Sequence, residues 1–211
     1  MDCINYQAIF FDFDGVILDS VHVKTQAFSF MFRQYGPEIE KEVVEYHLSN
    51  GGMSRFKKFE YYYTQLLNKP LDHKIAVTLG NDFSRLSLQG VLESPFIPGA
   101  LETLQELKQK KILCFIVSGT PDSELKLIVD KRGLAKYFSE IHGSPRKKDV
   151  IIKDIALRYK LVLQECLFVG DAMTDYEAAK STGTKFLGIV KSGEVSPFQE
   201  GTIVFESVKI F

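Results

Sequence analysis

Short apolar segments that stop abruptly at acidic or glycine residues constrain the fold of this chain more than any other feature. They are residues 6–11, 112–117, 166–169 and 186–190, with residues 203–205 as a candidate fifth. Such runs are typical of buried parallel strands. Stretches with helical periodicity separate them, as where leucines recur at positions 101, 104 and 107. This alternation predicts an α/β fold with a Rossmann-like parallel sheet that helices cover on both faces.

The stretch between the first two segments differs, because it contains no continuous β-branched run. Phe28, Met31 and Phe32 form one helical stripe there, and two more stripes follow within residues 56–67 and 75–86. We therefore predict an all-helical insert. The expected division is an α/β catalytic core at residues 1–15 and 96–211, with the helical insert at residues 16–95.

Composition argues against several broad classes of protein. Apolar residues make up 45% and charged residues 25% of the chain, which is ordinary for a soluble globular protein. The formal net charge is −1, so no overall field favours nucleic acid or an anionic membrane. No apolar run approaches the roughly 20 residues that a membrane span needs. We expect neither a nucleic-acid partner nor a membrane partner.

The three cysteines, Cys3, Cys114 and Cys166, show no spacing typical of a zinc site or a redox motif. The last two lie inside apolar runs, where a thiol usually packs as a small hydrophobic group. A reducing compartment fits this usage, and no basic-then-apolar signal opens the sequence. We therefore expect a cytoplasmic protein.

Polar side chains follow three of the predicted strands. They are Asp12 and Asp14, then Ser118 and Thr120, then Asp171 and Asp175. Ligands of open parallel sheets bind beyond the carboxyl ends of the strands, so we expect these residues to converge. At ~5 Å and an effective dielectric of ~20, each pair of carboxylates repels by roughly 3 kcal/mol, so the cluster needs a cation or a proton. Carboxylate oxygens suit Mg²⁺, and the pattern predicts a magnesium site.

Four motifs resemble those of the haloacid dehalogenase superfamily, in the family's order and across nearly the whole chain. They are residues 12–20 (Asp-Phe-Asp-Gly-Val-Ile-Leu-Asp-Ser), 116–120 (Ile-Val-Ser-Gly-Thr), a lysine within 143–148 (Gly-Ser-Pro-Arg-Lys-Lys) and 169–175 (Val-Gly-Asp-Ala-Met-Thr-Asp). The subgroup of phosphoglycolate phosphatases and β-phosphoglucomutases is the most similar, since it carries a helical cap after the first motif. The insert at residues 16–95 matches that cap and is called the cap below.

The resemblance implies that Asp12 is the nucleophile of a Mg²⁺-dependent phosphohydrolase and forms an aspartyl-phosphate. A carboxylate needs no base for this role, because it is already ionised at neutral pH. Asp14 would be the general acid for the leaving alcohol and then the general base for water, and its backbone carbonyl oxygen would bind the metal. To hold a proton near pH 7 its pKa must rise, and the charge of Asp12 acts in that direction.

The resemblance also implies roles for the other motif residues. The phosphate-binding group would be Ser118, Gly119 and Thr120, and the metal group would be Asp12, Asp14, Asp171 and Asp175. Lys148 would balance charge between the nucleophile and the phosphoryl group. Lys147 is the alternative, because the Lys-Pro pair common in the subgroup is absent here.

Two cap residues are candidates for substrate binding. Arg55 begins a helical pattern after a polar, glycine-containing loop, and its planar guanidinium suits a second anionic group. Lys24 lies one helical turn after Ser20 and is expected at the mouth of the site. The alternative for each side chain is an ordinary solvated surface residue. His47 and Lys58 are weaker candidates.

Three functions are compatible with these motifs: a small-metabolite phosphatase, a phosphomutase of the β-phosphoglucomutase kind, and a binding domain that retains the fold. All motif residues are present, which argues against the binding domain. The usual cap histidine of the mutases aligns with Lys24, which argues against a mutase. We therefore predict a phosphatase of a small phosphorylated metabolite. Phosphoglycolate, sugar phosphates and nucleotide monophosphates are all compatible with the motifs as substrates. The sequence makes no prediction of the oligomeric state.

Overall fold

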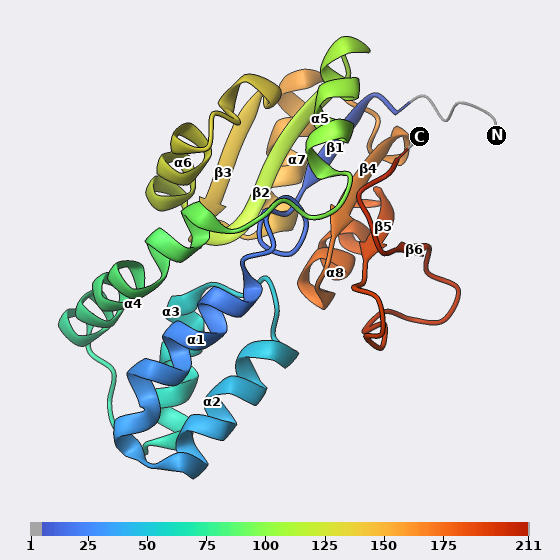
Figure 1. The fold of residues 1–211 in the computed structure, drawn as a ribbon. Helices are drawn as coiled ribbons and strands as arrows, with labels where there is room; N and C mark the ends of the chain where they lie inside the picture. Colours follow the sequence, from blue (N-terminus) through green and yellow to red (C-terminus); the bar gives the residue numbers. More distant parts are fainter. Residues whose placement is uncertain (1–5, 211) are drawn as a thin grey trace.

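The computed structural model describes residues 6–210, and its centre is a six-stranded parallel sheet (Figure 1). The strand order is β3-β2-β1-β4-β5-β6. The strands are β1 (Ala8–Phe11), β2 (Leu113–Pro121), β3 (Glu140–Ser144), β4 (Cys166–Gly170), β5 (Lys185–Ile189) and β6 (Val204–Phe205). Each apolar segment singled out in the sequence falls on one of these strands, and the predicted α/β fold is confirmed.

Strand β3 is the one strand that the apolar runs do not predict. Its sequence is Glu-Ile-His-Gly-Ser, with a single large apolar residue. It forms at the edge of the sheet by parallel pairing with β2, where Phe115 lies opposite Glu140 and Ile116 opposite Ile141. Tertiary pairing, rather than intrinsic propensity, makes this segment a strand.

Helices cover both faces of the sheet, and β1 shows how one apolar run fills two cores. Ile9 and Phe11 point to one face, whereas Ala8 and Phe10 point to the other, because successive side chains of a strand alternate. The helices on the first face are α5 (Ala100–Gln109) and α6 (Asp122–Lys131); those on the second are α7 (Lys148–Tyr159) and α8 (Met173–Thr182).

The cap contains four α-helices between β1 and β2. They are α1 (Val21–Phe32), α2 (Pro37–Ser49), α3 (Arg55–Tyr61) and α4 (His73–Glu93). They pack around an aromatic cluster of their own, formed chiefly by Phe28, Phe32, Phe59, Tyr62 and Phe83. In Figure 1, α1, α2 and α3 lie beyond one end of the sheet and α4 runs back toward α6.

The helical insert is thus confirmed. Its boundaries at residues 15/16 and 95/96 stay a prediction, and residues 1–5 of the predicted core lie outside the described residues. Shorter helical turns are a π-helix at Tyr62–Leu66 and 3-10 helices at Arg33–Tyr35, Ala135–Tyr137 and Leu163–Glu165. Between residues 6 and 210, no helix combines the length and the apolarity that a membrane crossing requires.

Two of the cysteines pack inside the sheet's cores. Cys114 and Cys166 are both buried and carry free thiols. Burial raises the pKa of Cys114 to about 12 and that of Cys166 to about 11, so both thiols stay protonated and unreactive. Cys3 lies outside the described residues.

Candidate active site

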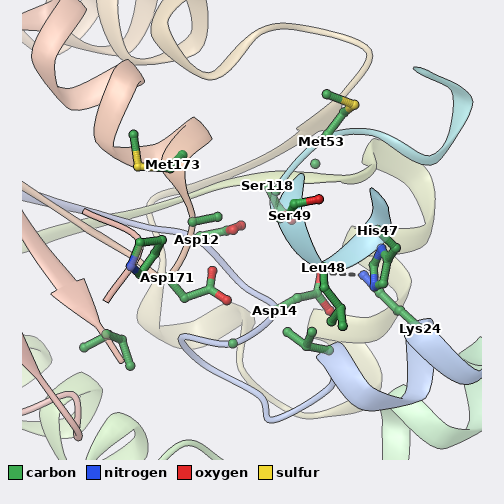
Figure 2. Close-up of a pocket in the computed structure, with 18 of the residues that line it drawn as sticks. Asp12, Asp14, Lys24, His47, Leu48, Ser49, Met53, Ser118, Asp171 and Met173 are labelled. Carbon is green, nitrogen blue, oxygen red and sulfur yellow. Dashed lines mark hydrogen bonds and ion pairs between the residues drawn. The ribbon is translucent and has the colours of Figure 1, made fainter. Parts of the chain in front are cut away.

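The carboxyl ends of β1 and β4 bring three predicted acidic residues together, of which Figure 2 shows Asp12 and Asp171. Asp12 follows β1 directly, and its backbone N–H donates to the carbonyl oxygen of Val169 on β4 at 2.9 Å. Asp171 follows β4, and Asp175 lies in the first turn of α8. One carboxylate oxygen from each of the three lies within 4.8 Å of the others. The parallel pairing of β1 and β4 therefore builds the acidic cluster.

Close packing at this edge of the sheet requires glycine at position 15. Gly15 has a φ of +80°, and a Cβ there would lie 2.0 Å from a carboxylate oxygen of Asp171. Any side chain would therefore push the first motif away from the fourth. Gly15, the fourth residue of the first motif, thus allows the close approach of that motif to Asp171.

Lys148 is the cation of the cluster. It is the first residue of α7, and its ammonium lies 3.0 Å from Asp12 and 2.5 Å from Asp175. The side chain is buried, whereas its neighbour Lys147 is exposed. Of the two lysines that the sequence left open, the structure therefore brings Lys148 to the acidic residues.

The cluster holds more negative charge than Lys148 can balance. Three carboxylates face one ammonium, so the cluster has a net charge of −2 when all three are ionised. Burial, followed by the charges of Asp12 and Asp175, raises the pKa of Asp171 well above its ordinary value. Burial also raises the pKa of Asp175 to about 7, against the opposing effect of Lys148. A hard divalent cation bound by these oxygens would neutralise the excess and remove the need for protons.

The carboxylate of Asp14 turns away from this cluster. It accepts hydrogen bonds from Ser20 at 2.6 Å and Thr120 at 2.8 Å and forms an ion pair with Lys24. Burial acts to raise the pKa of Asp14, but Lys24 and the two hydroxyl donors outweigh it, and the net shift is downward. The expectation of a raised pKa for Asp14 is therefore wrong for this arrangement. The charged group in contact with its carboxylate is the ammonium of Lys24, not the carboxylate of Asp12.

The second motif lies between the acidic cluster and the cap. Ser118 is buried and lines the same cavity as Asp12, and its hydroxyl accepts from the backbone N–H of Thr120 at 3.2 Å. A Cβ at Gly119 would lie 2.2 Å from the carbonyl oxygen of Gly52 in the cap. Glycine at position 119 thus lets the cap loop close directly over the strand ends.

The cap completes a cavity of about 440 Å³ over the acidic cluster. Asp12, Ser118 and Asp171 line it from the core; His47, Met53, Arg55 and Lys58 line it from the cap. Thr174 of the core donates to the carbonyl oxygen of Gly51 at 2.9 Å, which adds a direct link between the two parts. The cavity is large enough for a small metabolite and is bounded by both units.

The two cap candidates from the sequence are both engaged with carboxylates. Lys24 binds Asp14 and also donates to Thr120 at 2.7 Å. Arg55 is buried and uses both terminal nitrogens to bind Glu124 on α6, while one of them also donates to Ser84 at 2.7 Å. The guanidinium therefore joins the cap to the core in this arrangement.

Glu124 was not predicted as a site residue, because no motif of the sequence includes it. It is separated from Arg55 by 69 positions and lies in the first turn of an ordinary amphipathic helix. Ion pairs across such distances depend on how helices pack, which no local pattern encodes. The same holds for Lys191, whose ammonium lies 2.5 Å from Asp19 and ties the loop after β5 to the first motif.

Sequence comparisons with known proteins identify a family and several relatives. A family model for haloacid dehalogenase-like hydrolases matches residues 6–183. A phosphoglycolate phosphatase from Vibrio parahaemolyticus is 30% identical over 190 residues, which cover 86% of this chain and 82% of the relative. A phosphoglycolate phosphatase from Vibrio cholerae is 26% identical over 188 residues, covering 86% and 83%.

Solved structures show the same fold at low sequence identity. A β-phosphoglucomutase from Clostridium difficile has a TM-score of 0.79 at 19% identity, with 97% of this chain and 94% of that chain covered. A predicted phosphoglycolate phosphatase from Haemophilus somnus has a TM-score of 0.74 at 19% identity, with 96% and 95% covered. Both similarities cover the sheet and the helical insert together.

Proposed function

The chain belongs to the haloacid dehalogenase-like hydrolase family, and we propose that it is a Mg²⁺-dependent phosphatase of a small phosphorylated metabolite. The observation that carries the proposal is the setting of Asp12, whose buried carboxylate lines the cavity between core and cap, beside Lys148 and within reach of Asp171 and Asp175. Relatives named phosphoglycolate phosphatases support a phosphate ester as substrate. Buried free thiols support action in a reducing cytoplasm.

Asp12 would be the nucleophile. One of its oxygens accepts from the backbone N–H of Phe13 at 2.7 Å, and the other faces Lys148. In the first step a carboxylate oxygen bonds to phosphorus while the bond from phosphorus to the leaving oxygen breaks, which gives an aspartyl-phosphate. Ser118 and the Gly119 amide would bind the phosphoryl oxygens, and Lys148 would offset their charge.

Mg²⁺ would be held by the cluster of Asp12, Asp171 and Asp175, with the backbone carbonyl oxygen of Asp14 as a further ligand. When bound, the ion neutralises charge on the phosphate and lets an anionic nucleophile approach. The two negative charges that Lys148 leaves unbalanced suit one divalent cation. Carboxylate and carbonyl oxygens are the ligands that Mg²⁺ prefers.

Asp14 would transfer the protons of both steps. It gives a proton to the leaving oxygen in the first step, and it takes one from the water that then attacks phosphorus. That attack breaks the bond to Asp12 and releases inorganic phosphate. Because Lys24 keeps Asp14 ionised in this arrangement, Asp14 can act as an acid only after the contact opens or Lys24 passes it a proton.

A panel of phosphorylated metabolites with Mg²⁺ tests the proposal, with release of inorganic phosphate as the readout. We expect turnover of at least one small monoester by the wild-type protein and none by Asp12→Asn, since an amide is not a competent nucleophile. Asp154→Asn, at an exposed carboxylate, is the matched control and should keep full activity. Full activity of Asp12→Asn would refute the nucleophile.

The metal is tested without turnover by thermal unfolding in EDTA and in Mg²⁺. An ion that binds only the folded chain raises its melting temperature. The rise should disappear in Asp171→Asn and persist in Asp154→Asn. Equal melting temperatures with and without Mg²⁺ at millimolar concentration would contradict the metal assignment.

A phosphomutase remains the alternative within this family, and the same panel separates the two. Incubation with a hexose 1-phosphate should yield inorganic phosphate or no reaction. Conversion to the hexose 6-phosphate would replace the phosphatase proposal with the mutase. Lys24, which by the sequence resemblance aligns with the usual cap histidine of the mutases, is paired with Asp14 here.

A further inference from the structure

Lys58 differs from every other buried cation of the described chain, because it forms no ion pair with a carboxylate. The buried cationic side chains between residues 6 and 210 are Arg55, Lys58 and Lys148. Arg55 is paired with Glu124, and Lys148 with Asp12 and Asp175. Lys58 makes no ion pair within the described residues; its hydrogen bonds go to His47 alone. Burying an unpaired charge is costly, so a function must account for it.

The surroundings of Lys58 hold its ammonium in place without neutralising it. The ammonium donates to Nδ1 of His47 at 2.7 Å and to the carbonyl oxygen of His47 at 3.1 Å. The ring of Phe28 lies 5.7 Å away and offers only a weak cation–π contact. An ammonium has three donors, so one remains for a ligand. His47 is thus a positioning residue, and Lys58 has an unused hydrogen and an unused charge.

His47 is suited to this task because it stays neutral. Burial, followed by the charges of Lys58 and Lys24, lowers the pKa of His47 to about 3. A neutral ring can accept a hydrogen bond at Nδ1, which an imidazolium cannot. The same causes, burial first and then Lys24, lower the pKa of Lys58 itself to about 7. A bound anion would raise it again.

Both residues lie on the same cavity as the acidic cluster. Lys58 and His47 line it from the cap, while Asp12 and Ser118 line it from the core. In Figure 2, His47 lies beyond Asp14 as seen from Asp171 and Asp12, on the side of the cap. Charges on Asp14 and Asp171 are close enough to act on Lys58. A small substrate whose phosphate meets Asp12 can therefore extend its other end toward Lys58.

We propose that Lys58 is the specificity residue of this cavity and that its ammonium binds a carboxylate at the end of the substrate that lies away from the phosphate. The inference rests on the proposed phosphatase function and adds its specificity residue. One unpaired ammonium matches one negative charge, which favours a carboxylate over a second phosphate dianion. Arg55, expected from the sequence to bind the second anion, already has its carboxylate in Glu124.

Paired substrates test the proposal. 2-Phosphoglycolate carries a carboxylate, and ethyl phosphate has the same length without one. For Lys58→Met we expect kcat/KM on 2-phosphoglycolate to fall by about 30-fold or more, as for loss of a buried charge pair. On ethyl phosphate it should change less than about threefold. Lys57→Met, the exposed neighbour on α3, is the control and should leave both unchanged. Equal effects of Lys58→Met on both esters would overturn the proposal.

Binding separates this inference from the proposed function. The dissociation constant of 2-phosphoglycolate is measured by calorimetry on Asp12→Asn, with and without Lys58→Met. A loss of binding with Lys58→Met, specific to 2-phosphoglycolate over ethyl phosphate, supports the subsite even if no ester is hydrolysed. Unchanged binding refutes the subsite even if the phosphatase is real. Ethylene glycol bisphosphate is the third probe; preference for it over 2-phosphoglycolate, lost in Lys58→Met, would overturn the carboxylate assignment.

Discussion

The core and the cap carry an excess of buried charge of opposite sign. In the core, Lys148 lies between Asp12 and Asp175, and the surplus is negative. In the cap, Lys58 is buried beside Phe28 and a neutral His47, and the surplus is positive. Each surplus faces the same cavity. The core is therefore built to take a cation and the cap to take an anion.

The residues proposed for phosphate chemistry lie in the core, whereas those proposed for substrate specificity lie in the cap. The core's charged groups lie at the ends of hydrogen-bonded strands or at the start of a helix, so their spacing is fixed by the sheet. The cap's groups lie on helices packed around an aromatic cluster. Helix packing tolerates change better than strand register does, since a one-residue slip of a strand inverts its faces. Specificity residues can therefore change in the cap while the phosphate chemistry stays in the core.

Removal of the core's cation, Lys148, should destabilise the protein more than any other single change proposed below. Lys148→Met leaves the buried carboxylates of Asp12 and Asp175 and the half-buried one of Asp171 facing one another. We expect a loss of about 3 kcal/mol in the free energy of unfolding. Urea unfolding in EDTA measures it, because a bound metal would replace part of the lost charge. Lys147→Met, at the exposed neighbour, should lie within about 0.5 kcal/mol of wild type. Equal stability of the two variants would contradict a charge cluster held by Lys148.

The next effect concerns the ion pair that joins the two regions. Arg55→Met leaves Glu124 without its cation, next to Ser84, and should cost about 2 kcal/mol by urea unfolding. Arg55→Met with Glu124→Met removes both charges and should recover most of the loss, which a double-mutant cycle quantifies. Arg85→Met, which breaks the exposed pair with Asp82, should cost less than about 0.5 kcal/mol. Additive losses in the cycle would argue against coupling between cap and core.

The sequence predicts the core side of this comparison well and the cap side poorly. Asp12 and Asp171 follow apolar runs, and parallel strands place such residues at one edge, so their convergence follows from the fold class. The orientation of Asp14 does not follow, because it depends on a lysine from α1 and a hydroxyl from β2. Likewise, nothing in the local pattern around Arg55 or Lys58 shows that one has an acidic partner and the other has none.

A third, smaller effect tests whether a cap charge controls a core acid. Lys24→Met removes the cation that lowers the pKa of Asp14, so that pKa should rise. More Asp14 is then protonated at a given pH, and the alkaline limb of kcat/KM should move up by about 1 pH unit, or about 1.4 kcal/mol. Lys41→Met, at an exposed lysine of α2, should leave the profile in place. An unmoved limb would show that Asp14 is not the acid or that Lys24 does not hold its charge.

Loss of the cap's buried cation, Lys58, should not destabilise the protein as loss of the core's cation, Lys148, does. Lys58 has no acidic partner to leave behind, so Lys58→Met should keep the free energy of unfolding within about 1 kcal/mol of wild type or raise it.

The folded-state pKa of Lys58, about 7, lies below its ordinary value of 10.5, so the unfolded chain binds the proton more tightly. The charge of Lys58 therefore costs stability in full below pH 7, and the cost fades as the pH rises toward 10.5. The advantage of Lys58→Met in urea should thus be larger at pH 6 than at pH 10. A variant that is instead less stable, and most so at pH 6, would show that Lys58 has an anionic partner within the folded chain, and the cap would then resemble the core.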